Sequence, residues 1–589
     1  MPDPRQILRE TFGFPAFRGV QESVVDRVMA GRHSLAVMPT GAGKSLCYQI
    51  PALARPGTGL VISPLIALMH DQVRSAAAAG LRAAALTSAD DNRAETMDRF
   101  RAGQLDLLYV APERATTEGF RDLIRATPLS LIAIDEAHCV SEWGHDFRPD
   151  YRLLRPLLDS LGDVPRLALT ATADARTRDD ILQQLGIPAD GLILAGFDRP
   201  NIRYSASPRE GTGRQIADLL AGSPGPAIVY AQTRRDTEKF ATMLTASGRT
   251  VRAYHAGLDA SVRAANQNSF VRSEDMVMVA TVAFGMGIDK PDVRLVVHAG
   301  IPKSIEAYYQ ETGRAGRDGD PAAAHLFWGA EDFSRARQRT ERETPPERRP
   351  EERARLNALG AFCEAPGCRR AILLRHFGEN PLETCGNCDN CLSPPTAVDA
   401  SAVAQKLLSA VYRTGQRFGL GHVGDVLAGK TSERIAALGH DRLSVFGILS
   451  AGETPLLRPA ARALQVREAL VADDHGGLAL GPNARPLLKG EAQLSLVLPP
   501  LRKRRQRAGA TEHDHDPLFE ALRATRRELA SEAGVPPYVI FHDAVLRDIA
   551  AQRPLTRAAL ANISGVGTAK LDRYGRAFLQ TIEAHLATA

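Results

Sequence analysis

The most informative segment of this 589-residue chain is Met38-Pro39-Thr40-Gly41-Ala42-Gly43-Lys44-Ser45. It follows the short apolar run 35–37 and precedes residues 46–53, which have helical character. A strand, a glycine turn and a helix start form the local structure in which backbone N–H groups converge on an anion. Glycine at 41 and 43 leaves room for phosphate oxygens, because no Cβ stands in the way. The stretch therefore predicts a phosphate-binding loop.

Each residue of this loop has an expected role. Lys44 reaches the β- and γ-phosphates of a nucleotide, and the hydroxyl of Ser45 holds Mg²⁺. The residues expected to bind nucleotide through the loop itself are Thr40, Gly41, Ala42 and Gly43. Position 38 is methionine, which departs from the glycine that begins the general pattern. An ordinary glycine turn before a helix is the alternative interpretation.

Composition limits the class of protein. The 73 Lys and Arg residues nearly balance the 68 Asp and Glu residues, so any surface for nucleic acid has to be local. The N-terminus lacks the plan of a signal peptide and no apolar run approaches the length of a membrane span, so we expect a soluble cytoplasmic protein. The length predicts three to five domains. Seven cysteines in so long a chain do not indicate a disulfide scaffold.

Short apolar runs alternate with helical segments along the first 335 residues. The runs of the first half are 35–37, 59–62, 105–110, 129–134 and 167–169; those of the second half are 227–230, 251–254, 276–280 and 295–297. This alternation predicts parallel α/β sheets, whose ligands gather outside the carboxyl ends of the strands. The second set has no phosphate loop of its own. We therefore expect two lobes of similar architecture with a nucleotide in the cleft between them.

Two adjacent carboxylates, Asp135 and Glu136, directly follow the buried-looking run 131–134. Beside a phosphate loop, such a pair divides the chemistry of hydrolysis. Asp135 is expected to hold Mg²⁺ through water, and Glu136 to orient and deprotonate the attacking water. A solvated surface pair is the alternative.

An aromatic-rich segment lies just upstream of the phosphate loop. The planar amide of Gln21 has a donor and an acceptor that match the N6 and N7 edge of adenine, and Phe14 and Arg18 are predicted to sandwich the ring. For Gln21, chemistry alone leaves this role and an ordinary structural one open.

A second aromatic cluster, residues 141–151, comes straight after the carboxylate pair and uses one of only two tryptophans. Trp143 and Phe147 offer π-faces on which bases can stack, and Arg148 offers a phosphate or stacking contact. A plug of aromatics in the core is the alternative.

Four cysteines, Cys368, Cys385, Cys388 and Cys391, indicate a metal centre. Four thiolates suit tetrahedral Zn²⁺, which in a cytoplasmic chain is a better interpretation than disulfides. Cys363 and His376 are not included among the ligands, and Cys47 and Cys139 are expected to be packing residues. Because no sizeable apolar core is apparent around this segment, the metal is expected to be structural.

Several blocks, in order, resemble the motifs of the RecQ family of superfamily 2 helicases. They are the phosphate loop, residues 63–69, 111–114, the Asp-Glu-Ala-His block, the loop 141–151, 169–173, 285–291 and 308–319, together with the four cysteines. The resemblance implies that Arg314 and Arg317 reach across the cleft to the γ-phosphate; which of them dominates is open. It also implies that Asp289 contacts nucleotide and that His138 couples the nucleotide site to DNA.

The resemblance extends over nearly the whole chain and predicts where each domain begins and ends. We expect a first RecA-like lobe at 1–200, a second at 201–335, a zinc module at 336–395, a winged-helix domain at 396–500, a charged linker at 501–515 and a helical HRDC domain at 516–589. The wing, near 472–477, has no aromatic tip, so its role in strand separation is in doubt. The turn Gly565-Val566-Gly567 either donates to a DNA phosphate or simply joins two helices.

The family implies an ATP-dependent DNA helicase that moves 3′→5′ on single-stranded DNA in repair and recombination, with ATP, Mg²⁺ and Zn²⁺. Expected partners are single-stranded and forked duplex DNA and a single-strand-binding protein, with no membrane and a monomeric chain. Two alternatives remain. One is an RNA helicase on the same motor; the other is a zinc and winged-helix DNA-binding protein whose ATP site is regulatory or inactive.

Overall fold

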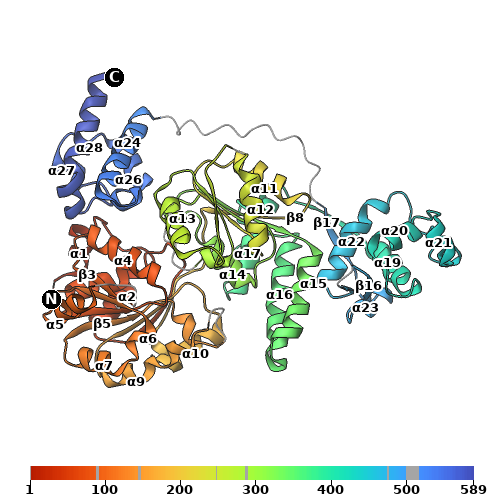
Figure 1. Ribbon diagram of the computed structural model, residues 1–589, viewed down its shortest axis with the longest axis horizontal. Coiled ribbons are helices and arrows are strands. Elements are labelled where there is room, and N and C mark those ends of the chain that lie inside the picture. The colour runs from red at the N-terminus through yellow and green to blue at the C-terminus, as the bar shows by residue number, and fades with distance from the viewer. Residues whose placement is uncertain are drawn as a thin grey trace.

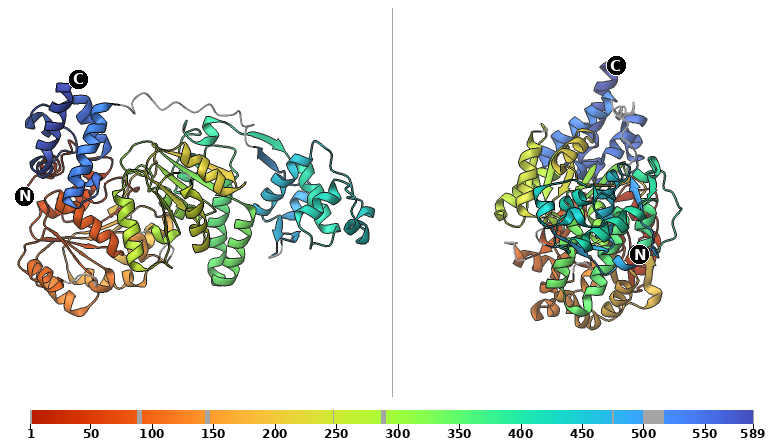
Figure 2. Two further views of the ribbon diagram at one scale, coloured as in Figure 1. Left: turned by 45° about the horizontal axis from the view of Figure 1, so that its top comes forward. Right: turned by 90° about the vertical axis from the view of Figure 1, so that its right-hand side faces the viewer.

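The computed structural model describes residues 2–87, 92–142, 147–246, 248–285, 290–473, 476–498 and 516–588. Two α/β lobes lie side by side, and a helical region connects the second lobe to a small domain at the far end of the molecule (Figure 1). The C-terminal helices return to the first lobe, so the two ends of the chain lie at the same side of the molecule (Figures 1 and 2).

The first lobe is a seven-stranded parallel sheet in the order β3-β4-β2-β5-β6-β1-β7. Its strands are β1 Ser34–Val37, β2 Thr58–Ile62, β3 Ala83–Leu86, β4 Leu107–Val110, β5 Leu129–Ile134, β6 Arg166–Thr170 and β7 Leu192–Leu194. The inner strands are buried and mainly apolar because helices cover both faces of a parallel sheet. β1, which leads into the phosphate loop, pairs with β6 and β7.

Helices flank this sheet on both sides. They are α1 Pro4–Glu10, α2 Gln21–Met29, α3 Leu46–Ala54, α4 Ile66–Ala78, α5 Arg93–Arg101, α6 Pro112–Ala115, α7 Glu118–Arg125, α8 Pro149–Arg152, α9 Leu154–Ser160 and α10 Ala175–Leu185, with 3₁₀ turns η1 Ala137–Val140 and η2 Ala189–Gly191. α3 begins directly after Ser45, as the sequence predicts.

The second lobe is a six-stranded parallel sheet in the order β10-β11-β9-β12-β13-β8. Its strands are β8 Ile202–Pro208, β9 Ala227–Tyr230, β10 Val251–Tyr254, β11 Val277–Ala280, β12 Leu295–His298 and β13 Ala322–Trp328; its helices are α11 Thr212–Ala221, α12 Arg234–Thr245, α13 Ala260–Arg272 and α14 Ile305–Thr312, with η3 Val282–Phe284. The prediction of two parallel-sheet lobes is thus confirmed.

A helical hairpin and a small cysteine-bearing segment follow the second lobe. The elements are α15 Ala330–Glu343, η4 Pro346–Arg348, α16 Arg349–Cys363, α17 Arg369–His376 and α18 Asp389–Leu392. The expectation that this segment lacks an apolar core was wrong. α16 and α17 bury Leu359, Phe362 and Leu373 in the same core cluster as the strands of the second lobe. The apolar side chains are spaced along helices and pack against another domain, so no local run reveals them.

The winged-helix region is a helical domain with two short antiparallel strand pairs. It comprises β14 Thr396–Asp399, α19 Ser401–Arg413, α20 Leu420–Leu427, α21 Glu433–Ala437, η5 His440–Arg442, α22 Thr454–Val466, β15 Leu470–Ala472, β16 Leu478–Leu480, α23 Ala484–Leu488 and β17 Ser495–Leu498. β15 and β16 form the expected wing. Residues 474 and 475, and the predicted linker 501–515, lie outside the described residues.

The C-terminal bundle consists of α24 Pro517–Ala533, α25 Pro537–Ile540, α26 Asp543–Gln552, α27 Arg557–Ala561 and α28 Thr568–Thr588. It packs on the first lobe, where the Gly565 amide donates to the Gly13 carbonyl at 2.7 Å. It also contacts the second lobe, because Arg526 pairs with Glu274 at 2.7 Å. In this structure the predicted Gly565–Gly567 turn therefore contacts protein backbone. Within the described ranges, no helix combines the length and hydropathy of a membrane span.

Candidate active site and metal centre

A cavity of about 410 Å³ lies where the two lobes and the C-terminal bundle meet. The predicted site residues that line it are Phe14, Arg18, Gln21, Thr40, Gly41, Ala42, Gly43, Lys44, Ser45, Asp135, Glu136, His138, Arg314 and Arg317. The bundle adds His542, Ala544, Val545, Asp548 and Ser564. Residues from positions 14 to 317 thus converge on one site.

The phosphate loop has the backbone that its glycines predict. Gly41 has φ +82° and Gly43 has φ +74°, both in the left-handed region that favours glycine. A Cβ on Gly43 would lie 2.5 Å from the amide nitrogen of Gln21. The Lys44 ammonium donates to the Met38 carbonyl at 3.2 Å. This hydrogen bond holds the Lys44 side chain across the loop. The loop is therefore shaped to surround an anion with the lysine at its side.

Asp135 directly follows the last residue of β5 and is almost fully buried. Its carboxylate accepts hydrogen bonds from the Gln72 amide at 3.1 Å and the Glu136 backbone N–H at 3.0 Å. Burial, with the neighbouring Glu136 charge, raises the pKa of Asp135 to about 6. A divalent cation would restore the charged form. A buried carboxylate that shares a cavity with the Ser45 hydroxyl fits the oxygen ligands that Mg²⁺ prefers.

Glu136 adopts a left-handed backbone, with φ 49°, which is strained for a residue other than glycine. One of its carboxylate oxygens, Oε2, is buried without a hydrogen bond and lies 3.4 Å from Nδ1 of His138. The Glu136 side chain also lines the cavity. A carboxylate at the wall of a nucleotide-sized cavity can take a proton from a water held there.

His138 connects the carboxylate pair to the end of β6. Its Nδ1 atom lies 3.0 Å from the hydroxyl of Thr170, which ends β6 and lies within the predicted 169–173 motif. Burial, together with the nearby Lys44 charge, lowers the pKa of His138 to about 3, so the imidazole is neutral. The His138 side chain therefore links Glu136 directly to Thr170.

The second lobe brings its arginines to the phosphate loop. α14 ends at Thr312, and the turn that follows carries Arg314 and Arg317. A Cβ on Gly41 would lie 3.1 Å from the Cα of Arg317, so the two backbones are in direct contact. The lobes are thus closed around the cavity, and both arginines line it.

The residues predicted to bind adenine lie together at the cavity, but Gln21 already uses its amide. Its nitrogen donates to the Ala42 carbonyl at 2.8 Å, and its oxygen accepts from the Arg18 backbone N–H at 2.9 Å. The Arg18 guanidinium lies 5.7 Å from the centre of the Phe14 ring. Their contacts with a base remain a prediction.

The predicted DNA-facing loop is only partly described. Arg148 donates to the Pro64 carbonyl at 2.9 Å, which joins the loop to the 63–69 motif. The Phe147 ring is covered by Arg152 at 5.3 Å. Trp143 and Asp289 lie outside the described residues.

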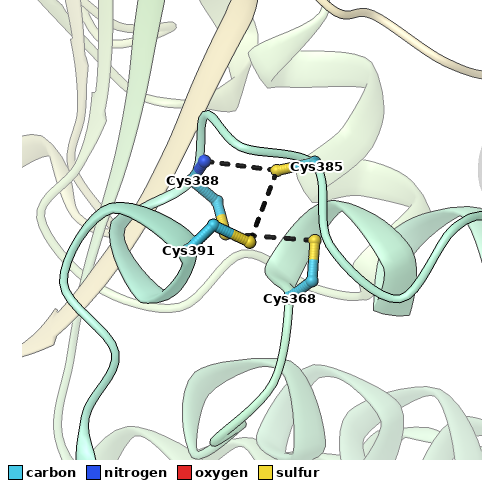
Figure 3. Close-up of side chains that lie close together, drawn as sticks. All are labelled: Cys368, Cys385, Cys388 and Cys391. Carbon is cyan, nitrogen blue, oxygen red and sulfur yellow. Dashed lines mark hydrogen bonds between the residues drawn. The ribbon is translucent and has the colours of Figure 1, made fainter.

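The four predicted zinc ligands come together. The sulfur atoms of Cys368, Cys385, Cys388 and Cys391 all lie within 4.8 Å of one another. Figure 3 shows the four side chains converging. Burial raises the pKa of Cys388 to about 12. Although burial opposes it, hydrogen bonds from the Cys385 backbone and the Cys388 thiol lower the pKa of Cys391 to about 7. Four converging sulfurs fit tetrahedral Zn²⁺, which would stabilise all four thiolates.

Sequence reasoning missed Gln72 and Arg199 as parts of this site, and it gave Tyr151 no role of its own within the aromatic cluster 141–151. Tyr151 donates to the Asp135 carbonyl at 3.0 Å. Arg199 donates to the Thr40 carbonyl at 2.6 Å. These residues act through contacts between distant segments, so no local pattern marks them.

Two α/β lobes around a phosphate loop, with arginines supplied from the second lobe, define a nucleoside triphosphatase motor of the helicase type. Five family models match consecutive parts of the chain: the DEAD/DEAH box helicase at 18–181, the helicase conserved C-terminal domain at 213–319, RecQ zinc-binding at 330–392, the RQC domain at 394–505 and the HRDC domain at 515–582.

Relatives that match the chain over nearly its whole length show the family to which it belongs. The chain is 42% identical to the ATP-dependent DNA helicase RecQ of Pasteurella multocida over 98% of this chain and 93% of that protein. It is 41% identical to the Haemophilus influenzae protein of the same name over 100% and 96%, and 39% identical to that of Bacillus subtilis over 99% and 98%. The chain belongs to the RecQ family. The family membership that the sequence motifs predict is thereby confirmed.

Proposed function

We propose that this chain is an ATP-dependent DNA helicase whose motor hydrolyses Mg-ATP between its two lobes. The observation that carries the proposal is the convergence of Lys44, Glu136 and Arg314 on one cavity, although they come from three separate parts of the chain. The RecQ relatives named as ATP-dependent DNA helicases match nearly the whole chain, which supports the same activity here.

We propose one step for each of these residues. The phosphate-loop amides and Lys44 hold the β- and γ-phosphates, and Arg314 and Arg317 neutralise charge on the γ-phosphate from the other lobe. Mg²⁺, held by Ser45 and through water by Asp135, would neutralise charge on the phosphate oxygens. Glu136 takes a proton from the attacking water, since its side chain lines the cavity next to the phosphate loop.

DNA is proposed to act on this site through the loop 141–151 and the β6 end. Trp143 and Phe147 would stack on bases, and Arg148 would contact the strand next to the 63–69 motif. The His138–Thr170 contact at 3.0 Å supports a path from the carboxylate pair to the 169–173 motif. Asp289 is proposed to contact the nucleotide from the second lobe.

Polarity of movement, DNA substrate, oligomeric state and partners belong to the same proposal. We propose 3′→5′ movement on single strands, action on forked duplexes in repair and recombination, a monomeric cytoplasmic chain, and cooperation with a single-strand-binding protein. The division of the chain at 200, 335, 395, 500 and 515 is part of the same proposal; the boundary at 335 falls inside α15.

An unwinding assay on forks with opposite single-stranded tails, with ATP and Mg²⁺, tests the proposal. ATP-dependent separation of a fork with a 3′ tail, and ATP hydrolysis that single-stranded DNA stimulates, are the expected results. Equal or greater stimulation by RNA would favour the RNA helicase. DNA binding without stimulated hydrolysis would favour a passive binding protein.

A further inference from the structure

Arg199 lies in the segment that joins the lobes, between β7 and β8, and is only 8% exposed. Its guanidinium donates to four backbone carbonyls. Nη1 contacts Thr40 at 2.6 Å and Gly313 at 3.2 Å. Nη2 contacts Ala315 and Gly316, each at 2.9 Å. Every acceptor is a backbone atom, so the positions of these atoms are set by the fold.

The four acceptors belong to the two halves of the nucleotide site. Thr40 is in the phosphate loop of the first lobe, whereas Gly313, Ala315 and Gly316 flank the two arginines of the second. A planar guanidinium with five donors in fixed directions can hold several carbonyls at once, and an ammonium cannot reproduce that pattern. Arg199 therefore fixes the spacing between the phosphate loop and the arginine turn.

The zinc module holds the segment that carries Arg199. The Phe197 ring stacks on Phe377 with centres 4.7 Å apart and an interplanar angle of 16°. The Phe197 amide donates to the Glu379 carboxylate. Arg370 donates to the Pro200 carbonyl at 2.9 Å. Residues on both sides of Arg199 are thus anchored to α17 and the turn after it.

The segment is also anchored to the second lobe. Asn201 donates to the carbonyls of Gly316 and Asp320, each at 2.8 Å. The Tyr309 hydroxyl, on α14, donates to the Phe197 carbonyl at 2.7 Å. Most of the Arg199 bonds are therefore made to the second lobe, and its bond to Thr40 reaches across to the phosphate loop. Separation of the arginine turn from the phosphate loop would break this bond.

We propose that Arg199 is a positioning residue for ATP hydrolysis, which locks the arginine turn onto the phosphate loop when the cleft closes. The zinc module supports the reaction by anchoring the segment around Arg199. This inference rests on the proposed ATPase function. It predicts an effect on turnover rather than on nucleotide affinity, because Arg199 reaches backbone carbonyls and leaves the phosphate-binding groups in place.

The test compares Arg199→Gln and Arg199→Lys with Arg166→Gln in the full-length, zinc-loaded chain. Arg166 is a matched control, since it is 6% exposed and donates to the carbonyls of Leu185 and Leu158, both at 2.9 Å, away from the cavity. Three quantities are measured for each protein: kcat and KM for ATP with single-stranded DNA, the affinity for a fluorescent non-hydrolysable ATP analogue, and the thermal unfolding midpoint.

Arg199→Gln is expected to lower kcat about 100-fold, the scale of a 1 Å misplacement of catalytic groups, and to leave analogue affinity within about 3-fold. Arg199→Lys is expected to recover part of kcat, since it restores the charge and at least one donor. Arg166→Gln is expected to lose stability with kcat changed by less than about 3-fold.

Equal kcat values for Arg199→Gln and Arg166→Gln would overturn the proposal. If Arg199→Gln does not fold, Arg199→Lys decides. A kcat per analogue-binding site at least about 10-fold below wild type supports the proposal, and any smaller loss overturns it. Failure of the wild-type chain to hydrolyse ATP with DNA would instead refute the function on which the inference rests.

Discussion

The Nε2 atom of His376 lies 2.6 Å from the Oε1 atom of Glu306. Although burial opposes it, the hydrogen bond to His376 lowers the pKa of Glu306 to about 2, so the carboxylate is charged at neutral pH. The pair joins α17 of the zinc module to α14, the helix that leads to Arg314. His376 is thus engaged by a carboxylate and stands apart from the four-sulfur cluster.

The sulfur cluster gives the first prediction. Cys388→Ala should lower zinc from about one per chain to well below half, because a four-coordinate structural site loses one ligand. Turnover should fall as well, since α17 anchors the segment around Arg199. Zinc content is measured by elemental analysis of purified protein. Cys363→Ala is the matched control, because Cys363 is equally buried in the same region but is not part of the cluster. Full zinc content in Cys388→Ala would refute the ligand set.

The second prediction concerns the phosphate loop. Lys44→Ala should lower kcat for ATP about 10²–10³-fold, because the charge beside the β- and γ-phosphates is lost. Binding of single-stranded DNA should change little, since the loop faces the cavity. Lys303→Ala, at an exposed position of the second lobe, should retain wild-type turnover. Steady-state ATPase assays measure the turnover of each variant, and DNA titrations measure its binding of single-stranded DNA. Near-normal turnover in Lys44→Ala would be incompatible with the assigned role.

The sequence predicted this site well where its residues are neighbours in the chain. The phosphate loop, the Asp135-Glu136 pair and the three clustered cysteines each combine a local pattern with a known chemistry. Arg199 and Gln72 carry no such pattern, because their partners are backbone or side-chain atoms more than 60 residues away. Nothing in a single sequence shows which distant carbonyls a guanidinium will meet.

The same limit applies to the fold. Inner strands such as β5 and β9 were predicted because burial on both faces makes them continuous apolar runs. Strands β3, β7, β8 and β13 were missed, since β3 is mostly alanine, β7 has only three residues, and β8 and β13 alternate buried with half-buried residues over part of their length. The docking of the C-terminal bundle on both lobes depends on single contacts such as Gly565 with Gly13, which no periodicity marks.

The closeness of the lobes gives the third prediction. Gly313 packs against the side chain of Thr40, and a methyl group there would collide with the Thr40 hydroxyl and lie 3.1 Å from the Tyr309 carbonyl. Gly313→Ala should therefore lower kcat roughly 10-fold or more by holding the arginine turn away from the phosphate loop. Gly421→Ala, where a Cβ meets nothing within 4 Å, is the control. Unchanged ATP turnover in Gly313→Ala would mean that the lobes do not approach this closely during the reaction.

The fourth prediction concerns pH. Burial, opposed by Arg467 and Arg462, raises the pKa of Glu364 to about 7. A raised carboxyl pKa means that the folded chain holds the proton more tightly than the unfolded chain. The stabilisation is complete below the unfolded pKa of about 4.3 and disappears as pH rises through about 7. Between pH 6 and 8 the loss is on the order of 1 kcal/mol.

Glu364→Gln removes this titration. The variant should gain roughly 1 kcal/mol of unfolding free energy relative to wild type between pH 6 and pH 8, as measured by denaturant unfolding of zinc-loaded protein. Glu347→Gln, at an exposed position of the same hairpin, should show no such pH-dependent difference. A wild-type-to-variant difference that is the same at both pH values would exclude the raised pKa.

The fifth prediction addresses how the C-terminal bundle is held. Glu274, on the second lobe, accepts from Arg526 at 2.7 Å and from Arg523 at 2.9 Å. Its removal should weaken docking by about 1.5 kcal/mol, the scale of a hydrogen bond to a charged group. The open, undocked form should then be roughly tenfold more populated.

Hydrogen exchange at Gly565 measures the population of the undocked bundle directly, because the Gly565 amide donates to the Gly13 carbonyl across the interface with the first lobe. In Glu274→Ala, exchange at Gly565 should be about tenfold faster than in wild type, while buried amides within β5 keep their protection. Glu520→Ala is the matched control, since Glu520 pairs with Arg523 but belongs to the bundle itself. Equal exchange in wild type and Glu274→Ala would show that the contacts with the first lobe hold the bundle without the arginine cluster.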